Sequence, residues 1–317
     1  MTDSQKSSTT KGKTSKDLLN EHYSLILQEK YGNQTSRIST KRNTKRIAMS
    51  KKRIAQFANV MAEIEKDKDM NTATAQVMDY VNSVFTTSSN QNSGIVEFTV
   101  DQYMKDAGSR LTSYRYARGK LKKALDNLLG VTLHYKGGSY FAGAMHIYSE
   151  YKIKRGGHVS ITLAPTYHKL LKSSFPMPMP KLLFQLNPLT QATSWYILRT
   201  LTENKRMNYG KPSADRLKVK YILAKCPSLP AYKEIAEEGH VSRKIMDPFF
   251  KALEPLTKAI DYTFIGPNGQ PLNYEEGLDY DSFADSIFVV KKWADYPDQY
   301  MTSYTQRRKA KQQHKKK

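Results

Sequence analysis

Cysteine, long apolar runs and acidic residues are scarce in this sequence, and each shortage excludes a class of protein. The single cysteine, Cys226, has no second cysteine to form a disulfide, and a cysteine-rich zinc site is equally excluded. No apolar run approaches the ~18 residues of a membrane-spanning helix. The first residues, MTDSQKSSTTKGKTSKDLL, contain no apolar signal region. We therefore expect a cytoplasmic protein with no membrane partner.

Acidic residues are too few to balance the basic ones. The chain has 51 Lys and Arg against 29 Asp and Glu, which gives a net charge of +22 and a pI near 9.7. Such an excess attracts polyanions. Since a membrane is already disfavoured, the composition favours nucleic acid as the partner.

Basic residues gather at the two ends of the chain. Residues 1–55 contain 13 basic and 4 acidic residues, and the segment after Tyr304 contains seven basic residues and no acidic one. Such composition is typical of disordered tails. We expect a basic, mostly disordered arm over 1–55, with one short helix in residues 15–32, and a disordered basic tail over 301–317. Arg307 and Arg308 in this tail are candidate DNA contacts.

Between the tails, two blocks repeat one order of elements. KKALDNLLG at 122–130 and FKALEPLTK at 250–258 share Lys-Ala-Leu, an acidic residue and a further leucine. Each run ends an expected helix, over 113–130 and 242–256, and alternating strands with turns follow. Both helices carry an apolar stripe at i, i+4, i+7, i+8 and i+11. The stripes are Ala117, Leu121, Ala124, Leu125 and Leu128 in the first helix, and Ile245, Phe249, Ala252, Leu253 and Leu256 in the second.

The elements around these helices complete the comparison. The first block has an expected helix over 72–85, a strand from 95 that turns helical, and a hairpin at KRGGH. The second has a helix over 188–208 and short helical pieces over 213–226 and 230–239. We therefore expect an α+β protein with two tandem winged helix-turn-helix domains and disordered basic N- and C-terminal tails. The expected domains span 56–173 and 187–300, joined by a Pro-rich linker over 174–186.

The helix over 113–130 has the chemistry of a DNA-reading helix. The second helix of a helix-turn-helix enters the major groove, where its N-terminal residues meet base edges. Arg115, Arg118 and Lys122 form one basic stripe, flanked by Lys120 and Lys123, and no acidic residue precedes Asp126. Arginine reads guanine with two hydrogen bonds, whereas lysine more often holds phosphates. A merely solvated helix face is the alternative interpretation. Ser113 is the expected N-cap of the helix and a further candidate contact.

The second block and the first hairpin supply further candidate DNA contacts. The start of the second reading helix and the segment before it are basic, and the first hairpin puts charge on a wing tip. These candidates are Ser242, Arg243, Lys244, Lys251, Arg216, Lys218, Lys220, Lys152, Lys154 and Arg155.

The tandem layout and one stretch of sequence carry a family resemblance. AKCPSLPAYKEIAEEG leading into KIMDPFFKALEPL resembles the Rep-type plasmid replication initiators, over roughly residues 70–293. The resemblance implies a protein of the bacterial cytoplasm or nucleoid that binds double-stranded repeats at a plasmid origin and helps to open or distort the DNA. It also implies recruitment of a host initiator and replicative helicase, and a homodimer through the first domain. The expected protein is not an enzyme and needs no cofactor or metal.

Two alternatives stay open. Tandem winged helices also suit a transcriptional repressor. The other alternative is a metal-dependent nicking Rep or nuclease. A nicking Rep would need a His-hydrophobe-His pair, but no two of the seven histidines are separated by one residue. The acidic residues between 275 and 285 could hold Mg²⁺, yet no Lys or His motif frames them, so we interpret this segment as a polar loop.

Overall fold

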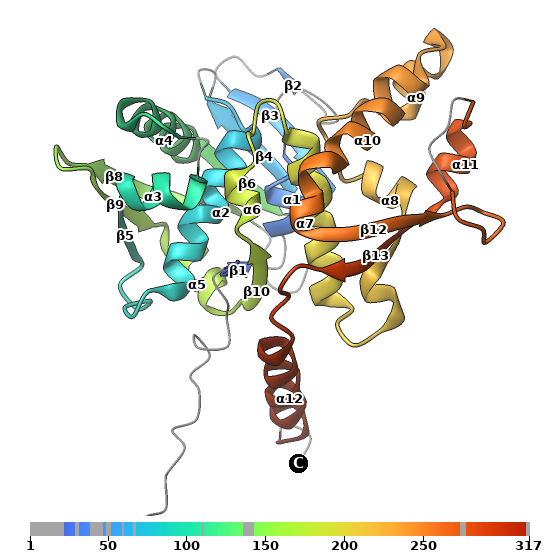
Figure 1. The fold of residues 1–317 in the computed structure, drawn as a ribbon. Coiled ribbons are helices and arrows are strands. Elements are labelled where there is room, and N and C mark those ends of the chain that lie inside the picture. Colours follow the sequence, from blue (N-terminus) through green and yellow to red (C-terminus); the bar gives the residue numbers. More distant parts are fainter. Residues whose placement is uncertain are drawn as a thin grey trace, which may run out of the picture.

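Figure 1 shows the chain as a computed structural model. The structure describes residues 22–28, 32–38, 47–48, 52–58, 60–65, 68–108, 111–135, 143–272 and 277–314. Helices and small antiparallel sheets are mixed along the chain, so the predicted α+β class is confirmed.

The first unit has the predicted order of helix, strand, two helices and hairpin. Local capping fixes where its helices begin. Asn71 accepts a hydrogen bond from the Thr74 amide at 3.0 Å, and Thr99 forms a reciprocal capping box with Gln102. The strands form one antiparallel sheet in the order β5-β9-β8. The elements are α2 (Thr72–Thr87), β5 (Ile95–Thr99), α3 (Val100–Ala107), α4 (Tyr114–Leu129), β8 (Tyr148–Ile153) and β9 (His158–Leu163).

The second unit repeats that topology. Its sheet has the order β11-β13-β12, so the strand before the paired helices again lies beside the last strand of the hairpin. The second unit therefore has the same order of elements as the first. Its elements are α7 (Ala192–Met207), β11 (Arg216–Lys218), α8 (Val219–Leu223), the π-helical turn η4 (Ser242–Met246), α10 (Asp247–Leu253), β12 (Ile260–Ile265) and β13 (Ile287–Trp293).

The two apolar stripes lie where the sequence comparison predicts. Each member of one stripe is followed by its counterpart 128 residues later. All ten side chains are buried, from the fully covered Leu125 and Leu253 to Ala252 at 8% exposure. Helix α4 in the first unit, and η4 with α10 in the second, therefore pack on their own units in the same register. In each case the opposite face is left to solvent.

A second sheet extends the first unit. Its order is β2-β3-β4-β6-β7, and β4 pairs with β6, the strand that directly follows α4. The strands from residues 47–65 in this sheet are not among the sequence predictions. Its strands are β2 (Ile47–Ala48), β3 (Lys52–Phe57), β4 (Val60–Glu65), β6 (Val131–Tyr135) and β7 (Ala144–His146).

The prediction of a disordered arm with one helix is wrong for the described residues near the N-terminus. Tyr23–Gln28 forms strand β1, which pairs with β10 (Phe175–Pro180), and α1 (Gly32–Thr35) follows. Residues Tyr23, Leu25, Ile26 and Leu27 are all buried, so both faces of the strand are covered. Apolar residues on both faces have no period of 2, and this is why the stretch resembles part of a helical stripe.

The expected Pro-rich linker is extended but is part of the packed structure. Its prolines at 176, 178 and 180 alternate with Met177 and Met179, which are buried. Proline lacks an N–H, so alternating prolines leave one edge of β10 without donors while the other edge pairs with β1. The strand therefore ends a two-stranded sheet, and α6 (Leu182–Gln185) leads on toward the second unit.

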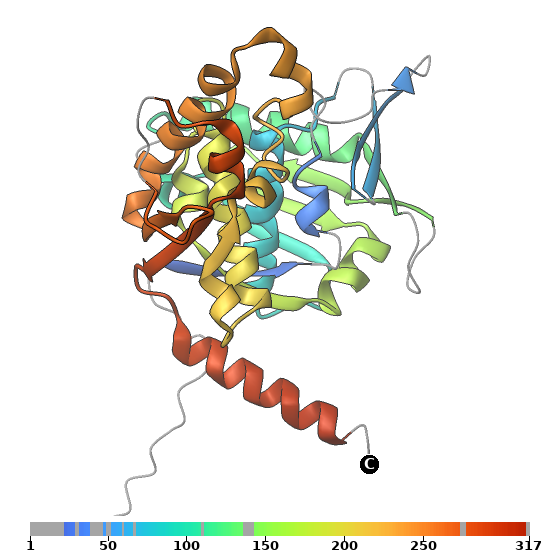
Figure 2. The same cartoon turned by 90° about the vertical axis from the view of Figure 1, so that its right-hand side faces the viewer.

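The prediction of a disordered C-terminal tail is also wrong for most of its length. Asp298–His314 forms helix α12. Its first turns are anchored because Tyr300 and Met301 are buried against Leu25 of β1. Beyond these turns α12 projects from the body of the molecule (Figure 2). Arg307 and Arg308 lie on this projecting part, where only the backbone is described.

A buried ionic network joins the two units. Arg37, just after α1, donates to Glu203 at 3.1 Å and to Thr200 at 2.9 Å, both on α7. Arg199 on the same helix donates to Glu203 at 3.1 Å and pairs with Asp79 on α2. All four charged side chains are at most 3% exposed. One continuous core of apolar side chains also spans both units. The units are therefore packed together rather than tethered.

Short elements complete the fold. Among the described residues, no helix is long and apolar enough to cross a membrane. The remaining elements are α5 (Pro165–Lys172), η2 (Pro212–Asp215), α9 (Tyr232–Ile235), η3 (Ala236–Glu238), η5 (Glu254–Lys258) and α11 (Tyr280–Asp285).

Candidate nucleic-acid interface

The start of α4 presents its predicted residues to solvent. Ser113 is the N-cap, and its hydroxyl accepts a hydrogen bond from the Tyr116 amide at 3.4 Å. Arg115 is exposed on the first turn. Tyr114 and Tyr116 beside it are exposed to 38% and 50%. Neither tyrosine was among the sequence candidates, although aromatic residues interleaved with arginine in SYRYAR are a signal of nucleic-acid binding.

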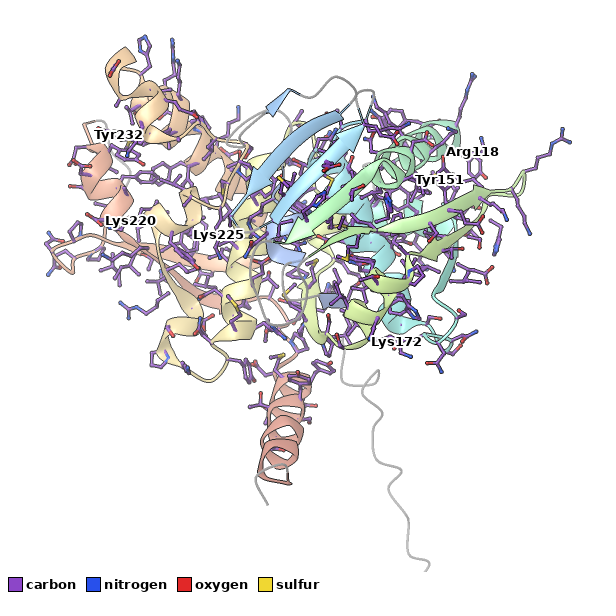
Figure 3. All side chains as sticks on the ribbon, turned by 180° about the vertical axis from the view of Figure 1, so that it is seen from behind. Arg118, Tyr151, Lys172, Lys220, Lys225 and Tyr232 are labelled. Carbon is purple, nitrogen blue, oxygen red and sulfur yellow. The ribbon has the colours of Figure 1, made fainter. Side chains whose placement is uncertain are left out.

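Arg118 connects α4 to the hairpin of β8 and β9, which we call the wing. Its Nη2 donates to the carbonyl oxygen of Ile153, at the end of β8, at 3.4 Å. Figure 3 labels Arg118 on α4 and Tyr151 on β8, two elements that pack against each other. Arg118 is only half-buried, so part of the residue remains accessible to solvent. Arg118 therefore fixes the position of the β8–β9 hairpin relative to α4.

The wing turn is built to approach α4 closely. Gly157 has φ of +75°, and a Cβ at this position would collide with the hydroxyl of Tyr114. Only glycine fits both the left-handed backbone and the close contact. The Gly157 carbonyl also accepts a hydrogen bond from Val100 at 2.9 Å, so the turn is fixed against α3 as well. The wing tip with Lys154 and Arg155, both exposed, is thereby held beside the N-terminus of α4.

Lys122 has an intramolecular partner. It pairs with Asp126 at 2.7 Å, and the hydroxyl of Tyr151 on β8 donates to the other oxygen of Asp126. Burial raises the pKa of Asp126, but the hydrogen bonds from Lys122 and Tyr151 outweigh burial and hold that pKa below its ordinary value. Lys122 therefore belongs to the connection between α4 and the wing, and its charge is largely compensated.

The other basic residues of the first unit are more available. Lys120 lies 5.0 Å above the ring of Tyr116, and Lys123 is exposed on the next turn. Lys152 lies 3.7 Å from Glu150 on the same strand, a distance that leaves its ammonium group mostly hydrated. The sequence candidates of α4 and the wing thus form one basic surface, with Lys122 as the compensated member.

The helix of the second unit that corresponds to α4, formed by η4 and α10, places its candidates similarly. Ser242 and Arg243 are exposed on the first turn, Lys244 is half-buried, and Lys251 is exposed two turns on. The offset of 128 residues that aligns the buried stripes also aligns Arg243 with Arg115, and Lys251 with Lys123. Both units therefore present an arginine on the first turn and a lysine on the third.

The basic segment before this helix is organised differently from the prediction. Residues Arg216 and Lys218 lie on strand β11, where the sequence predicts helix. Lys220 on α8 pairs with Asp285 at 2.7 Å, and Lys218 approaches the same carboxylate at 3.7 Å. Arg216 is exposed. Of the three, only Arg216 has no carboxylate within the ion-pair distance in the part of the chain that the structure describes.

The acidic segment does not gather into a metal site among the described residues. Asp279 caps α11 by accepting from the Ser282 amide at 2.8 Å, and Asp285 is engaged with the two lysines. No group of three His, Cys, Asp or Glu side chains with metal-binding geometry occurs within the described ranges, which omit 273–276. Glu275 and Glu276 lie outside those ranges.

Comparisons with known proteins give distant similarities only. No protein-family model matches the chain, and no curated protein matches it. Two solved structures of domains 2 and 3 of RctB are similar, each at 10% sequence identity. One has a TM-score of 0.46 over 83% of this chain and 97% of the RctB chain; the other has 0.43 over 87% and 97%. At this identity and these scores, the similarity carries no argument about what the chain binds.

Proposed function

We propose that this chain is a sequence-specific double-stranded DNA-binding protein that initiates plasmid replication. The observation that carries the proposal is the equivalence of the two recognition helices. Over matching buried stripes, Arg115 and Arg243 are exposed at the same position, on the turn that meets base edges in a helix-turn-helix. Two recognition helices of the same design on one chain suit a long DNA site in which each helix contacts one of two adjacent halves.

The electrostatics of the first unit support a duplex partner. The exposed side chains of Arg115, Lys123, Lys154 and Arg155 lie on α4 and on the wing that is fixed beside it. A helix for the major groove and an adjacent basic hairpin for the backbone match the two kinds of contact that a duplex needs. The affinity should then fall steeply with salt, because each phosphate contact releases counterions.

The choice of an initiator over a repressor depends on the sequence resemblance. The residues that carry it, from AKCPSLPAY to FFKALEPL, form the segment around α9, η4 and α10. By this resemblance the protein binds repeats at an origin, distorts or opens the DNA, and recruits the host initiator and helicase. A homodimer through the first unit and the absence of catalytic activity and cofactor belong to the same proposal.

Selection of binding sites from a random duplex pool at two salt concentrations tests the proposal. We expect enrichment of one site about two turns of the duplex in length, and repeats of that site beside the gene. Opening of a plasmid carrying those repeats, probed with a single-strand-specific reagent, then separates an initiator from a repressor. Tight binding without enrichment of any sequence would refute the specific reader. Enrichment without DNA opening would favour the repressor.

A further inference from the structure

The wings of the two units carry opposite charge. In the first unit the hairpin turn bears Lys154 and Arg155, and Lys152 precedes them. In the second unit the strands β12 and β13 are separated by residues 266–286, which include the acidic helix α11. The second unit therefore has carboxylates in the connection between its last two strands, the connection in which the first unit has Lys154 and Arg155.

Helix α11 is held firmly against the second recognition helix. Phe283 is fully buried, with its ring 5.3 Å from that of Phe249 on α10. The hydroxyl of the buried Ser286 donates to the Phe283 carbonyl at 2.6 Å, and the backbone carbonyl of Ser286 accepts from the amide of Val219, the first residue of α8, at 2.9 Å. The end of α11 is thus fixed both to the recognition helix and to the start of α8, and the position of Asp285 follows from these buried contacts.

Asp285 engages two candidate DNA-binding lysines at once. Its carboxylate lies 2.7 Å from Lys220 and 3.7 Å from Lys218, while all three side chains remain about half exposed. The hydrogen bond and charge of Lys220, with Lys218 contributing less, hold the pKa of Asp285 below its ordinary value. The carboxylate is therefore ionised at neutral pH and compensates part of the charge of both lysines.

A phosphate would have to compete with this carboxylate for the same lysines. On any duplex, sequence-independent affinity grows with the number of lysines and arginines free to neutralise phosphates. We infer that Asp285 is a specificity determinant, which limits sequence-independent DNA binding by the second unit by holding Lys218 and Lys220 away from phosphates. The inference rests on the proposed function. Because fewer phosphate contacts then contribute to the affinity of the second unit, base reading by Arg243 supplies a larger share of that affinity.

The experiment compares Asp285→Asn with Asp281→Asn in the full chain. Asp281 is exposed on the same helix, and its side chain forms no ion pair with Lys or Arg among the described residues. Asp281→Asn therefore changes the net charge as much as Asp285→Asn does, but it releases no lysine. Dissociation constants are measured on the selected site and on random duplex over a series of salt concentrations. For Asp285→Asn we expect about 3- to 10-fold tighter binding to random duplex and a salt slope steeper by about one to two, as expected for one or two added phosphate contacts. The gain on the selected site should be smaller, so the specificity ratio falls.

The remaining outcomes are decisive in the other direction. Equal shifts for Asp285→Asn and Asp281→Asn would mean that only long-range charge matters, and would overturn the inference. Weaker binding of Asp285→Asn would mean that the carboxylate positions the lysines for DNA instead. The effect of Asp285→Asn should also vanish when Lys218 and Lys220 are both changed to Gln. If the wild-type chain shows no site preference at all, the proposed function itself fails, and this result is distinct from a wild type that is specific but unaffected by Asp285→Asn.

Discussion

Glu203 is the residue on which both buried arginines converge. Burial raises the pKa of its carboxyl, but the charges of Arg37 and then Arg199 outweigh burial and hold the pKa below the ordinary value of 4.5. A carboxylate whose pKa is lowered in the folded state adds stability above its unfolded pKa, and that stability is lost as the pH falls through the folded pKa. The network therefore makes the fold sensitive to acid.

Changing Glu203 to Gln should lower the free energy of unfolding at pH 7 by about 3–5 kcal/mol, because two buried guanidinium groups lose a shared partner. The difference from the wild type should narrow as the pH falls from 4.5 through the lowered folded-state pKa, since the wild-type carboxyl takes up a proton first in the unfolded chain and then in the folded one. Urea denaturation at a series of pH values measures this. Glu237→Gln, at an exposed position, is the control and should change stability by less than about 0.5 kcal/mol. A difference that stays constant with pH would contradict the assignment.

Arg115 and Arg243 have matching positions, so they allow a matched test. If each reads a base, its change to Ala should cost about 1–3 kcal/mol on the selected site and relax the preference at one position of its own half. The same changes should have a smaller effect on random duplex. Arg155→Ala on the wing tip is the comparison, since a phosphate contact is expected to weaken both duplexes alike. Binding measured by fluorescence anisotropy distinguishes the two patterns, and equal losses for Arg115→Ala on both duplexes would demote it to a phosphate contact.

Single residues were predictable where the information is local. Ser113 as N-cap of α4 and the buried stripes follow from spacing alone, and the structure confirms them. The partners of Lys218 and Lys220 were not predictable, because Asp285 is 65 residues from Lys220 and is brought there by folding. The pairing of Lys122 was partly predictable, since Asp126 lies one helical turn away. The hydrogen bond from Tyr151 to Asp126 was not, because it comes from another element.

Strand β1 shows why the N-terminal segment belongs to the folded body. Ile26 is 1% exposed within the main core, and the Leu27 amide donates to Thr86 on α2 at 2.7 Å. A strand covered on both faces and paired with a proline-bearing strand gives no alternating pattern, and so the sequence did not reveal it. The three-residue strand β11 was missed for a related reason, since three residues are too few to show a period.

Ile26→Ala should therefore lower the free energy of unfolding by about 2–4 kcal/mol, the cost of a cavity in a packed core. Denaturant titration followed by circular dichroism measures it. Ser24→Ala, on the same strand but half-buried, is the matched control and should change little. If Ile26→Ala were as stable as the wild type, the segment would be a dispensable arm, as the composition alone had indicated.

Under the proposed function, the arrangement of the two units determines what kind of DNA site the whole chain would read. In Figure 1, α4 and α10 lie on the same upper side of the molecule, on either side of α2 and α7. Between them, β10 and α6 are packed and Gln76 on α2 donates to the carbonyl oxygens of Leu183 and Leu186 at 2.6 and 3.0 Å. Together with the network around Glu203, these contacts fix the separation of the recognition helices. A linker of the kind expected from the prolines would have left that separation free.

A fixed separation makes the spacing between the two halves of the site critical. Inserting 5 base pairs between the halves turns one of them about half a helical turn away, and 10 base pairs restore the face but move it by about 34 Å along the axis. We expect both insertions to reduce the affinity to that of a single half-site, by about 100-fold or more, when binding is measured on duplexes that differ only in the insert. A duplex with one half replaced by random sequence sets the reference value. A flexible pair of domains would regain most of its affinity at 10 base pairs, so recovery to within a few fold of the uninterrupted site would show that the packed arrangement opens when the protein binds DNA.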